Sequence, residues 1–452
     1  MGKLFVALTA ITVLTFFVGL GSPSIADSDE AFYAESAREM VESGNWLTPH
    51  FNYVYRFEKP VLYYWLAGLS YLALGVSEMA ARLPSAFAGL GLTLVTFFAA
   101  RRWYGNSTGF LAGAITATSF GYVAMARQAL PDLTLAFFVT LTTWAGLRLW
   151  GDQSLVGRPD EAGSAKRGLW IFTVGLGMAG GILGKGPLGI ILPCLVVIPI
   201  IVWQSSTLGS KPQFKVREFA ALALTIVFFA APWYLLMTFQ HGAEYLDRFF
   251  LTENFDRFTT ARYNAPRPFW YYLPIVIAGM LPWSPFLLLW IRDLLIAVRR
   301  RVMLTGTNLQ LLWWAAAPIV FFSLSIGKQP RYILPVLPPL AILLASHLQS
   351  QISNQRPKLL FKVCIGITAT VICLIGFLVY RATPLLPQWP VSLITMLSAL
   401  IVLSGFGVLL SITRPSLTPA AIVGASIVIA LGAHLIVLSS PSDAPVKSVA
   451  HI

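Results

Sequence analysis

Apolar runs of roughly 18 or more residues recur from one end of this chain to the other. A helix of that length crosses the hydrocarbon core of a bilayer, which is about 30 Å thick. Only 11% of the 452 residues are charged, whereas soluble domains carry about 25%. The pattern therefore predicts an all-α polytopic membrane protein.

Thirteen runs are predicted to span the membrane. They cover residues 4–21, 83–100, 107–126, 131–149, 169–184, 187–203, 218–238, 269–291, 309–326, 331–348, 361–380, 391–412 and 417–438. Residues 1–26 also have the pattern of a signal peptide, with Lys3, an apolar core and a small-residue end. We favour an uncleaved first span, because the acidic segment that follows it is then held at the membrane surface.

The distribution of basic residues tests this topology, because cytoplasmic loops are enriched in Lys and Arg. With the N-terminus in the cytoplasm, the inside segments hold 18 of the 32 basic residues but only 5 of the 19 acidic ones. The whole net charge of +13 then lies on the cytoplasmic side. A membrane protein with this asymmetry needs no nucleic-acid partner to explain its charge.

The run at residues 61–76 is too short to be an obvious span, and a span there would place Arg299, Arg300 and Arg301 outside. We predict an interfacial helix with its aromatic residues in the headgroup zone, namely Tyr63, Tyr64, Trp65 and Tyr71. Residues 1–440 then form one membrane domain, roofed by exterior loops 22–82 and 239–268. Residues 441–452 form a short exterior tail.

Five short charged stretches fall at the exterior ends of apolar runs. They are Asp29-Glu30, Glu58-Lys59-Pro60, Pro131-Asp132, Lys185-Gly186-Pro187 and the segment from Gly327 to Tyr332. The first stretch opens an amphipathic helix, residues 29–43, which Asp27 or Asp29 can cap and which Gly44 follows. Asp29 is thus either a helix cap or a carboxylate that faces a site, and the spacing does not separate the two.

The other stretches also allow two interpretations each. Glu58 and Lys59 are either an exposed ion pair or site residues at a helix start marked by Pro60. Asp132 is either a first-turn anion favoured by the helix dipole or a functional carboxylate. Lys185 lies between two apolar spans, where an unpaired lysine costs roughly 2.5–3.5 kcal/mol or more. It either snorkels to the interface or binds an anion.

The cysteines and histidines suggest neither a disulfide framework nor a metal site. The three cysteines lie inside apolar runs, and the five histidines show no metal-ligand spacing. Asp29, Glu58 and Asp132 could gather around a divalent cation. Several cations are already available for an anionic substrate, so no metal is predicted.

Several motifs together resemble the ArnT-like and protein O-mannosyltransferase superfamily of GT-C membrane glycosyltransferases. The resemblance covers about residues 27–340 and rests on motif order as well as content. The motifs are Asp-Glu-x-x-Tyr-Ala-Glu, Phe-Glu-Lys-Pro-Val-Leu-Tyr-Tyr-Trp, Arg-Gln-Ala-Leu-Pro-Asp at 127–132, Gly-Lys-Gly-Pro at 184–187, Glu-Asn-Phe-Asp-Arg-Phe at 253–258 and Lys-Gln-Pro-Arg-Tyr at 328–332.

The resemblance implies that the protein takes a sugar from a polyprenyl-phosphate donor in the bilayer and transfers it to an acceptor lipid, glycan or protein. The lipid-linked sugar is then a co-substrate, and no other cofactor is expected. By this resemblance Asp29 is the candidate general base and Asp132 the second catalytic carboxylate. The predicted phosphate-binding cations are Lys59, Lys185, Arg257, Lys328 and Arg331, and the predicted substrate contacts are Glu30, Glu58, Glu253 and Tyr332.

Two departures argue against a lipid A acceptor. The family often has His where Asn254 stands, and its lipid A aminoarabinose transferases carry a soluble C-terminal exterior domain. A transporter or flippase is the main alternative function, but it predicts midplane charges and repeated halves. An oligosaccharide polymerase or ligase also works at the outer face, although the Asp-Glu and Glu-Lys-Pro motifs argue against that class. We expect the active site on the periplasmic face of a bacterial inner membrane.

Overall fold

The computed structural model describes residues 2–25, 27–151, 164–208, 215–256, 259–260, 266–353, 359–437 and 439. Over these residues, ten helices are long and apolar enough to cross a membrane, and a bent pair forms an eleventh candidate span. The predicted exterior tail, residues 441–452, lies outside the described residues. The chain is an integral membrane protein built almost entirely of helices.

The N-terminal half begins with α1 (Gly2–Thr12) and the π-helical turn η1 (Val13–Phe17). The first long loop holds α2 (Ser28–Ser43), the hairpin strands β1 (His50–Phe51) and β2 (Val54–Tyr55), and α3 (Leu62–Leu74). The bundle continues with α4 (Glu78–Tyr104), α5 (Asn106–Thr118), α6 (Phe120–Ala126), α7 (Pro131–Gly146), η2 (Leu147–Gly151), α8 (Ser164–Lys185), α9 (Leu188–Leu208) and α10 (Val216–Leu246).

After α10 come η4 (Asp247–Asp256), η5 (Phe269–Tyr271), α12 (Tyr272–Gly279), α13 (Ser284–Arg299) and α14 (Gly306–Leu324). The remaining elements are η6 (Pro330–Val336), α15 (Leu337–Ser353), α16 (Leu359–Arg381), η7 (Thr383–Leu385), α17 (Val391–Leu410), η8 (Pro415–Leu417), α18 (Thr418–Gly432) and η9 (Ala433–Val437).

Each of the thirteen predicted spans has a helical counterpart, but not every one is a full-length helix. The first is the short pair α1 and η1, which ends at Phe17. Span 107–126 is the pair α5 and α6, bent by 59°. Span 269–291 is divided among η5, α12 and the first part of α13. By length and composition, ten or eleven of the described helices are full spans.

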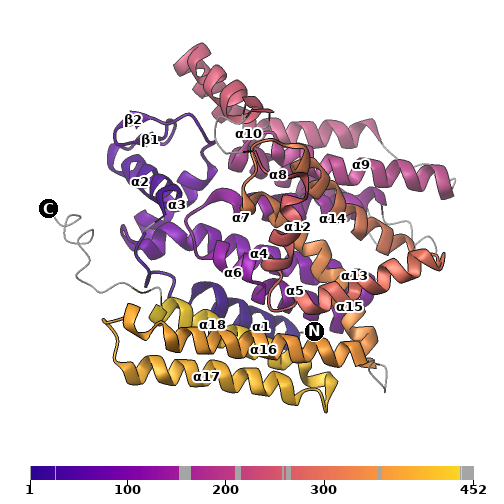
Figure 1. The fold of residues 1–452 in the computed structure, drawn as a ribbon. Helices are drawn as coiled ribbons and strands as arrows, with labels where there is room; N and C mark the ends of the chain where they lie inside the picture. The colour runs from indigo at the N-terminus through magenta and orange to yellow at the C-terminus, as the bar shows by residue number, and fades with distance from the viewer. Residues whose placement is uncertain are drawn as a thin grey trace.

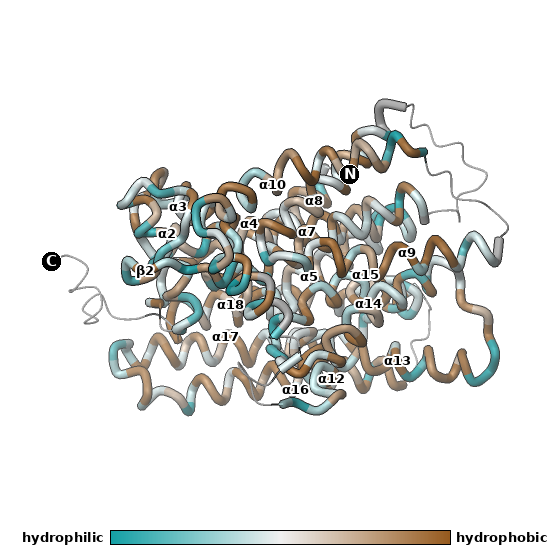
Figure 2. The backbone as a smooth tube through the Cα atoms, turned by 90° about the horizontal axis from the view of Figure 1, so that it is seen from above, coloured by the Kyte–Doolittle hydropathy of each residue, from teal (hydrophilic) through white to brown (hydrophobic). Residues whose placement is uncertain are grey.

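The long helices lie roughly side by side (Figure 1). In that view α16, α17 and α18 form the lower layer, and α8, α9 and α10 lie toward the top, with α4, α5 and α7 between them. The loop elements α2, α3, β1 and β2 gather at the left end of the bundle. Figure 2 shows hydrophobic residues along the long helices and a concentration of hydrophilic residues around α2 and β2.

The first long loop packs into a hydrophobic core that it shares with α8 and α10, which corrects one prediction. The rings of Tyr63, Tyr64 and Tyr71 in α3 were expected in the headgroup zone, yet all three are buried in protein. Tyr63 and Tyr64 both pack on Tyr33 of α2, and the Tyr71 hydroxyl donates to the Ala34 carbonyl (3.1 Å). These rings are amphipathic, so they fill a core while each hydroxyl has a hydrogen-bond partner.

Glycines set the close packing that positions the turn between α8 and α9. Gly186 follows Lys185 with a φ of +75°, a left-handed conformation that glycine adopts without strain. Further along, a Cβ on Gly189 would lie 2.3 Å from the carbonyl carbon of Gly181. The two helices therefore approach backbone to backbone, and this contact fixes the position of Lys185 at the end of α8.

Candidate active site

A polar cavity of about 270 Å³ lies where the first long loop meets the ends of α7, α8 and η4. Its walls come from segments far apart in the sequence. The residues that line it are Asp29, Phe32, Tyr33, Arg56, Glu58, Lys59, Asp132, Lys185, Glu253, Gln329, Arg331 and Tyr332. Eight of the eleven residues predicted for the site are among these twelve.

Asp29 reaches the cavity because another residue caps its helix. The Asp27 carboxylate accepts a hydrogen bond from the Asp29 backbone N–H (2.8 Å), and Gly44 ends α2 with a φ of 67°. This is the arrangement expected for an N-cap and a left-handed C-cap. The Asp29 side chain is thereby free, and it accepts a hydrogen bond from Nη2 of Arg331. The structure thus assigns the helix cap to Asp27 and places Asp29 in the cavity wall.

Asp132 lies in the first turn of α7, after Pro131 at the first helical position. Its Oδ1 pairs with Nζ of Lys185, and its Oδ2 lies 3.5 Å from Nε of Arg331. Arg331 is also held by a 2.9 Å hydrogen bond to Gln329. One arginine therefore bridges both carboxylates. The lysine predicted to bind a phosphate is paired with an acid of the same cavity.

Lys59 approaches the cavity from the loop before α3. Its Nζ donates to the Glu58 carbonyl (3.0 Å) and to Oε2 of Glu253 (2.9 Å), with both charged side chains nearly buried. Glu58 faces Arg56 instead, at 3.7 Å. Adjacent Glu58 and Lys59 are thus not one exposed ion pair. Pro60 precedes α3 by two residues rather than starting it.

Aromatic faces complete the walls. The Lys185 ammonium lies 4.5 Å from the ring centroid of Tyr332, and the Arg56 guanidinium lies 4.6 Å from that of Phe32. Both are cation–π geometries. Tyr33 stacks on Tyr64, and burial raises the pKa of Tyr33 well above its usual value, so its phenol stays neutral.

Sequence reasoning missed four residues of this cavity. Phe32 and Tyr33 lie in the predicted amphipathic helix 29–43, and neither was predicted to line a site. Arg56 lies two residues before Glu58, and Gln329 lies inside the motif at 328–332, so proximity to Glu58 and Arg331 was the available signal. Periodicity identifies the apolar face of a helix. It does not show which residues of that face pack in the core and which line a cavity.

Three predicted site residues are not placed in this cavity. The Lys328 ammonium donates to the carbonyls of Ser325 and Arg267, the latter at 3.3 Å, and the side chain is buried outside the cavity lining. Glu30 turns to the opposite side of α2. Arg257 lies outside the described residues.

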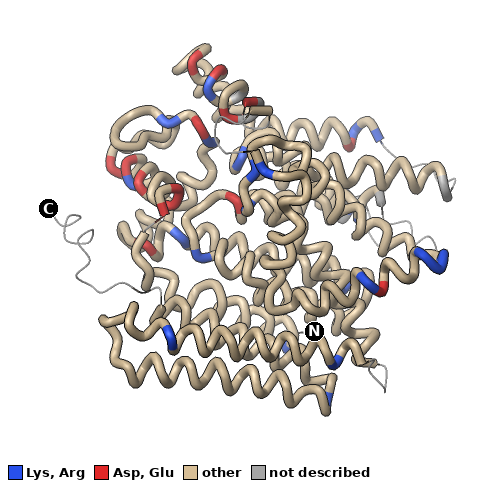
Figure 3. Tube along the Cα trace, viewed as in Figure 1, with Lys and Arg blue, Asp and Glu red and all other residues tan. Residues whose placement is uncertain are grey.

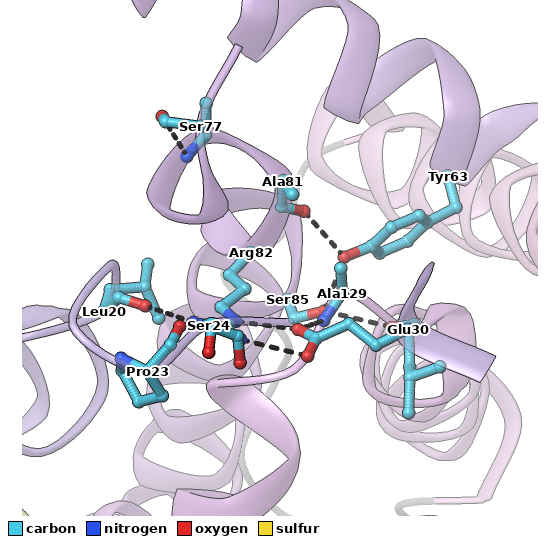
Figure 4. A network of polar contacts seen from close by, with 12 residues as sticks. Leu20, Pro23, Ser24, Glu30, Tyr63, Ser77, Ala81, Arg82, Ser85 and Ala129 are labelled. Atoms are coloured by element: carbon cyan, nitrogen blue, oxygen red, sulfur yellow. Dashed lines mark hydrogen bonds and ion pairs between the residues drawn. The ribbon is translucent and has the colours of Figure 1, made fainter. Parts of the chain in front are cut away.

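Glu30 ties α2 to the bundle (Figure 4). Its carboxylate accepts two hydrogen bonds from Arg82 of α4 (2.7 and 3.0 Å) and one from the Ala129 N–H (2.8 Å). Arg82 also donates to the carbonyls of Leu20 and Pro23. Since both charged side chains are almost fully buried, this network holds the neighbouring Asp29 in position.

The charges have an uneven distribution over the molecule. Figure 3 shows acidic and basic residues mixed around the loop elements, and basic residues at the far end of α13. Within the described residues, no group of three or more His, Cys, Asp or Glu side chains is arranged to hold a metal ion. The cavity instead alternates carboxylates with cations, an arrangement suited to an anionic group bound beside a proton acceptor.

Comparison with known proteins places the chain that carries this site in a family. The model of the dolichyl-phosphate-mannose-protein mannosyltransferase family matches residues 6–246. The undecaprenyl phosphate-alpha-4-amino-4-deoxy-L-arabinose arabinosyl transferase of Edwardsiella ictaluri is 34% identical over 343 residues, which cover 76% of this chain and 59% of that protein. The second such transferase of Proteus mirabilis is 30% identical over 398 residues, 85% of this chain and 67% of its own.

The fold has a solved counterpart. The crystal structure of ArnT from Cupriavidus metallidurans bound to undecaprenyl phosphate matches with a TM-score of 0.73 and 27% identity, over 95% of this chain and 77% of that one. The chain spans about three fifths of the length of the Edwardsiella relative. It has the GT-C fold and belongs to the dolichyl-phosphate-mannose-protein mannosyltransferase family.

Proposed function

We propose that this protein is a membrane glycosyltransferase that moves a sugar from a polyprenyl-phosphate donor to a hydroxyl or phosphate oxygen of an acceptor. The observation that carries the proposal is the polar cavity. It brings two aspartates, Asp29 and Asp132, together with Lys59, Lys185 and Arg331. The cavity is near the lower end of ligand pockets, roughly 300–1,000 Å³, which suits a single sugar and its phosphate.

The cations supply the leaving-group side of this reaction. As the bond between the anomeric carbon and the phosphate oxygen breaks, its electron pair passes to the phosphate. Lys59, Lys185 and Arg331 are fixed in place by carboxylates, so they can neutralise that charge without reorganising. The donor phosphate would share these cations with the acids that now hold them.

Asp29 is the better candidate for the base. Its side chain is 41% exposed, whereas that of Asp132 is 5% exposed. An acceptor can therefore reach Asp29, which takes the acceptor proton as the acceptor oxygen bonds to the anomeric carbon. Attack from the face opposite the phosphate inverts the anomeric configuration. Asp132 then serves to position Lys185 and Arg331.

The relatives support the donor class. Both named transferases act with an undecaprenyl phosphate-linked amino-arabinose, and the matching ArnT structure holds undecaprenyl phosphate. A polyprenyl phosphate is thus the carrier to test first, with a pentose as the first sugar. The charged residues of the cavity gather at one end of the bundle, which does not favour a transporter with a midplane site.

The site is proposed to face the periplasm of a bacterial inner membrane. The basic end of α13 lies opposite the loop elements (Figure 3). Basic segments stay cytoplasmic, so the cavity falls on the exterior side and the N-terminus inside.

The test is sugar transfer by purified protein. A radiolabelled polyprenyl-phosphate pentose is incubated with the protein in lipid nanodiscs, and release of polyprenyl phosphate and labelled product is followed. The Asp29→Asn variant, inserted and folded, serves as the inactive reference. Transport of intact donor across the bilayer without cleavage would contradict the proposal, as would no release with any pentose or hexose donor.

A further inference from the structure

A second, larger cavity of about 640 Å³ lies on the other side of the first turn of α2. It shares no lining residue with the polar cavity. Glu30 and Asp27 face it, whereas Asp29 between them in the sequence faces the polar cavity. The helix turn thus separates two chambers, and the transferase chemistry accounts for only one.

The wall of this second cavity is amphipathic. Val371 and Ile375 of α16 and Ile429 and Ala430 of α18 supply an apolar side. The other side carries polar groups from the loop before α2 and from the ends of α4 and α6, including Ser24, Arg82, Arg127 and Gln128. Such a cavity matches a molecule with a hydrocarbon chain and a polar head.

The two arginines at the polar end differ in their pairing. Arg82 is neutralised by the two-pronged contact with Glu30 (Figure 4). Arg127 is 4% exposed, and among the described residues it has no carboxylate partner. A buried charge is normally paired, because leaving it uncompensated is strongly unfavourable.

Arg127 has a structural role, but that role does not use the whole guanidinium. Its Nε donates to the Thr15 carbonyl (2.7 Å) and its Nη2 to the Val18 carbonyl (2.5 Å), at the end of η1. The partial negative charge of a helix C-terminus offsets part of the cation's cost. Nη1 has no hydrogen-bond partner among the described residues. An anion would supply the missing countercharge.

We propose that this cavity binds an anionic membrane lipid distinct from the sugar donor, with its phosphate-bearing head at Arg127 and a hydrocarbon chain along α16 and α18. The charge of Arg127 recognises the head, and the apolar wall takes the chain. The inference concerns a separate chamber; in the tests below, only the site expected in the polar cavity rests on the proposed function.

Dodecyl phosphate is a simple probe for such a site. Binding of radiolabelled dodecyl phosphate is measured on the purified full chain in a neutral detergent. We expect two sites on the unmodified protein, one in each cavity. Ala430→Trp fills the second cavity and should remove one of them. Ala420→Trp, at an exposed position of the same helix, should keep both.

Substitutions of charged residues test which cavity holds each bound probe and whether Arg127 binds the phosphate head. Lys185→Ala should weaken binding in the polar cavity. It should not change binding in the second cavity, which Ala430→Trp removes. Arg127→Gln should weaken the α18-side site by at least about tenfold, the loss of one charged hydrogen bond, while Arg127→Lys keeps most of the affinity. Equal binding by dodecyl maltoside or by inorganic phosphate alone would overturn the proposal, because it requires both the chain and the charge.

A photoreactive alkyl phosphate tests the unmodified protein, so the result does not depend on a variant that folds. Crosslinks are expected on residues 371–375 and 426–434, and vesicles of phosphatidylglycerol should suppress them more than vesicles of phosphatidylcholine. Polyprenyl phosphate at a concentration that saturates the polar cavity should not reduce these crosslinks. Crosslinks confined to the polar cavity, or their complete loss with polyprenyl phosphate, would refute a separate lipid site.

Discussion

Asp29 and Asp132 are the same chemical group in one cavity, yet their surroundings differ. Asp132 is buried between Lys185 and Arg331, while Asp29 is partly exposed and, within the described part of the chain, forms an ion pair with Arg331 only. A base must reach its acceptor, and a buried carboxylate held by two cations cannot. Their exposure and pairing support the different tasks that we propose for the two aspartates.

Asp29→Asn should reduce turnover by about 10²–10⁴-fold, because a carboxamide cannot take the acceptor proton. Donor binding should change little, since the phosphate-side cations remain. Turnover and donor affinity are measured on the same preparation. Glu35→Gln is the matched control. Glu35 lies on the same helix, pairs with Arg38 and does not line the cavity. Similar turnover in the two variants would remove Asp29 from the mechanism.

Two lysines from the family motifs also lie in different surroundings. Lys185 lines the polar cavity, whereas Lys328 is held by backbone carbonyls outside it. Lys185→Ala should weaken binding of the polyprenyl-phosphate donor by roughly 1.5–3 kcal/mol. Lys328→Ala should weaken it less, since only the loop that precedes Arg331 is affected. Titration with a fluorescent donor measures the affinity of each variant. A larger loss of affinity in Lys328→Ala than in Lys185→Ala would contradict the placement of the two ammonium groups.

At the scale of elements, α2 is positioned by a buried ion pair as well as by its apolar face. Glu30→Gln leaves the Arg82 guanidinium buried without its anion, and breaking one partner of such a pair costs about 3–5 kcal/mol. We expect a clear fall in the unfolding temperature. Activity per folded molecule should also fall, because Asp29 is carried by the same helix turn. Unchanged stability would show that the network does not hold α2.

The contact between α8 and α9 gives a second prediction at this scale. Gly189→Ala places a Cβ against the backbone of Gly181, so the two helices must separate. Overpacking of this kind costs typically about 1–3 kcal/mol, and it should shift Lys185 and weaken donor binding. Gly168→Ala in α8 has open space around it and is the matched control. Unfolding temperature and donor affinity are measured for both, and equal effects would rule out the close contact.

For the whole molecule, charge distribution and fold together predict an orientation. A reporter fused after residue 301 should be cytoplasmic, since it follows the basic end of α13. One fused after residue 265, before α12 and α13, should be periplasmic. Paired alkaline phosphatase and green fluorescent protein fusions read the two sides. Reversal at either point would contradict the predicted orientation of the polar cavity.

The sequence by itself determined the class of protein, the order of its spans and most of the cavity residues. Apolar length decides which segments enter a bilayer, and this property is local. The motifs around Asp29, Lys59, Asp132, Lys185 and Arg331 could therefore be placed at span ends before any fold was known, because charged groups are costly elsewhere.

Only the tertiary structure decided how those charges pair. Lys59 meets Glu253 from a distant segment, Asp29 meets Arg331, and Glu30 leaves the cavity for Arg82. It also buried the tyrosines of α3 and divided or bent two of the predicted spans. Hydropathy records how favourably a residue leaves water, but not which partner it then meets. Partner choice depends on helix packing between segments far apart in the chain.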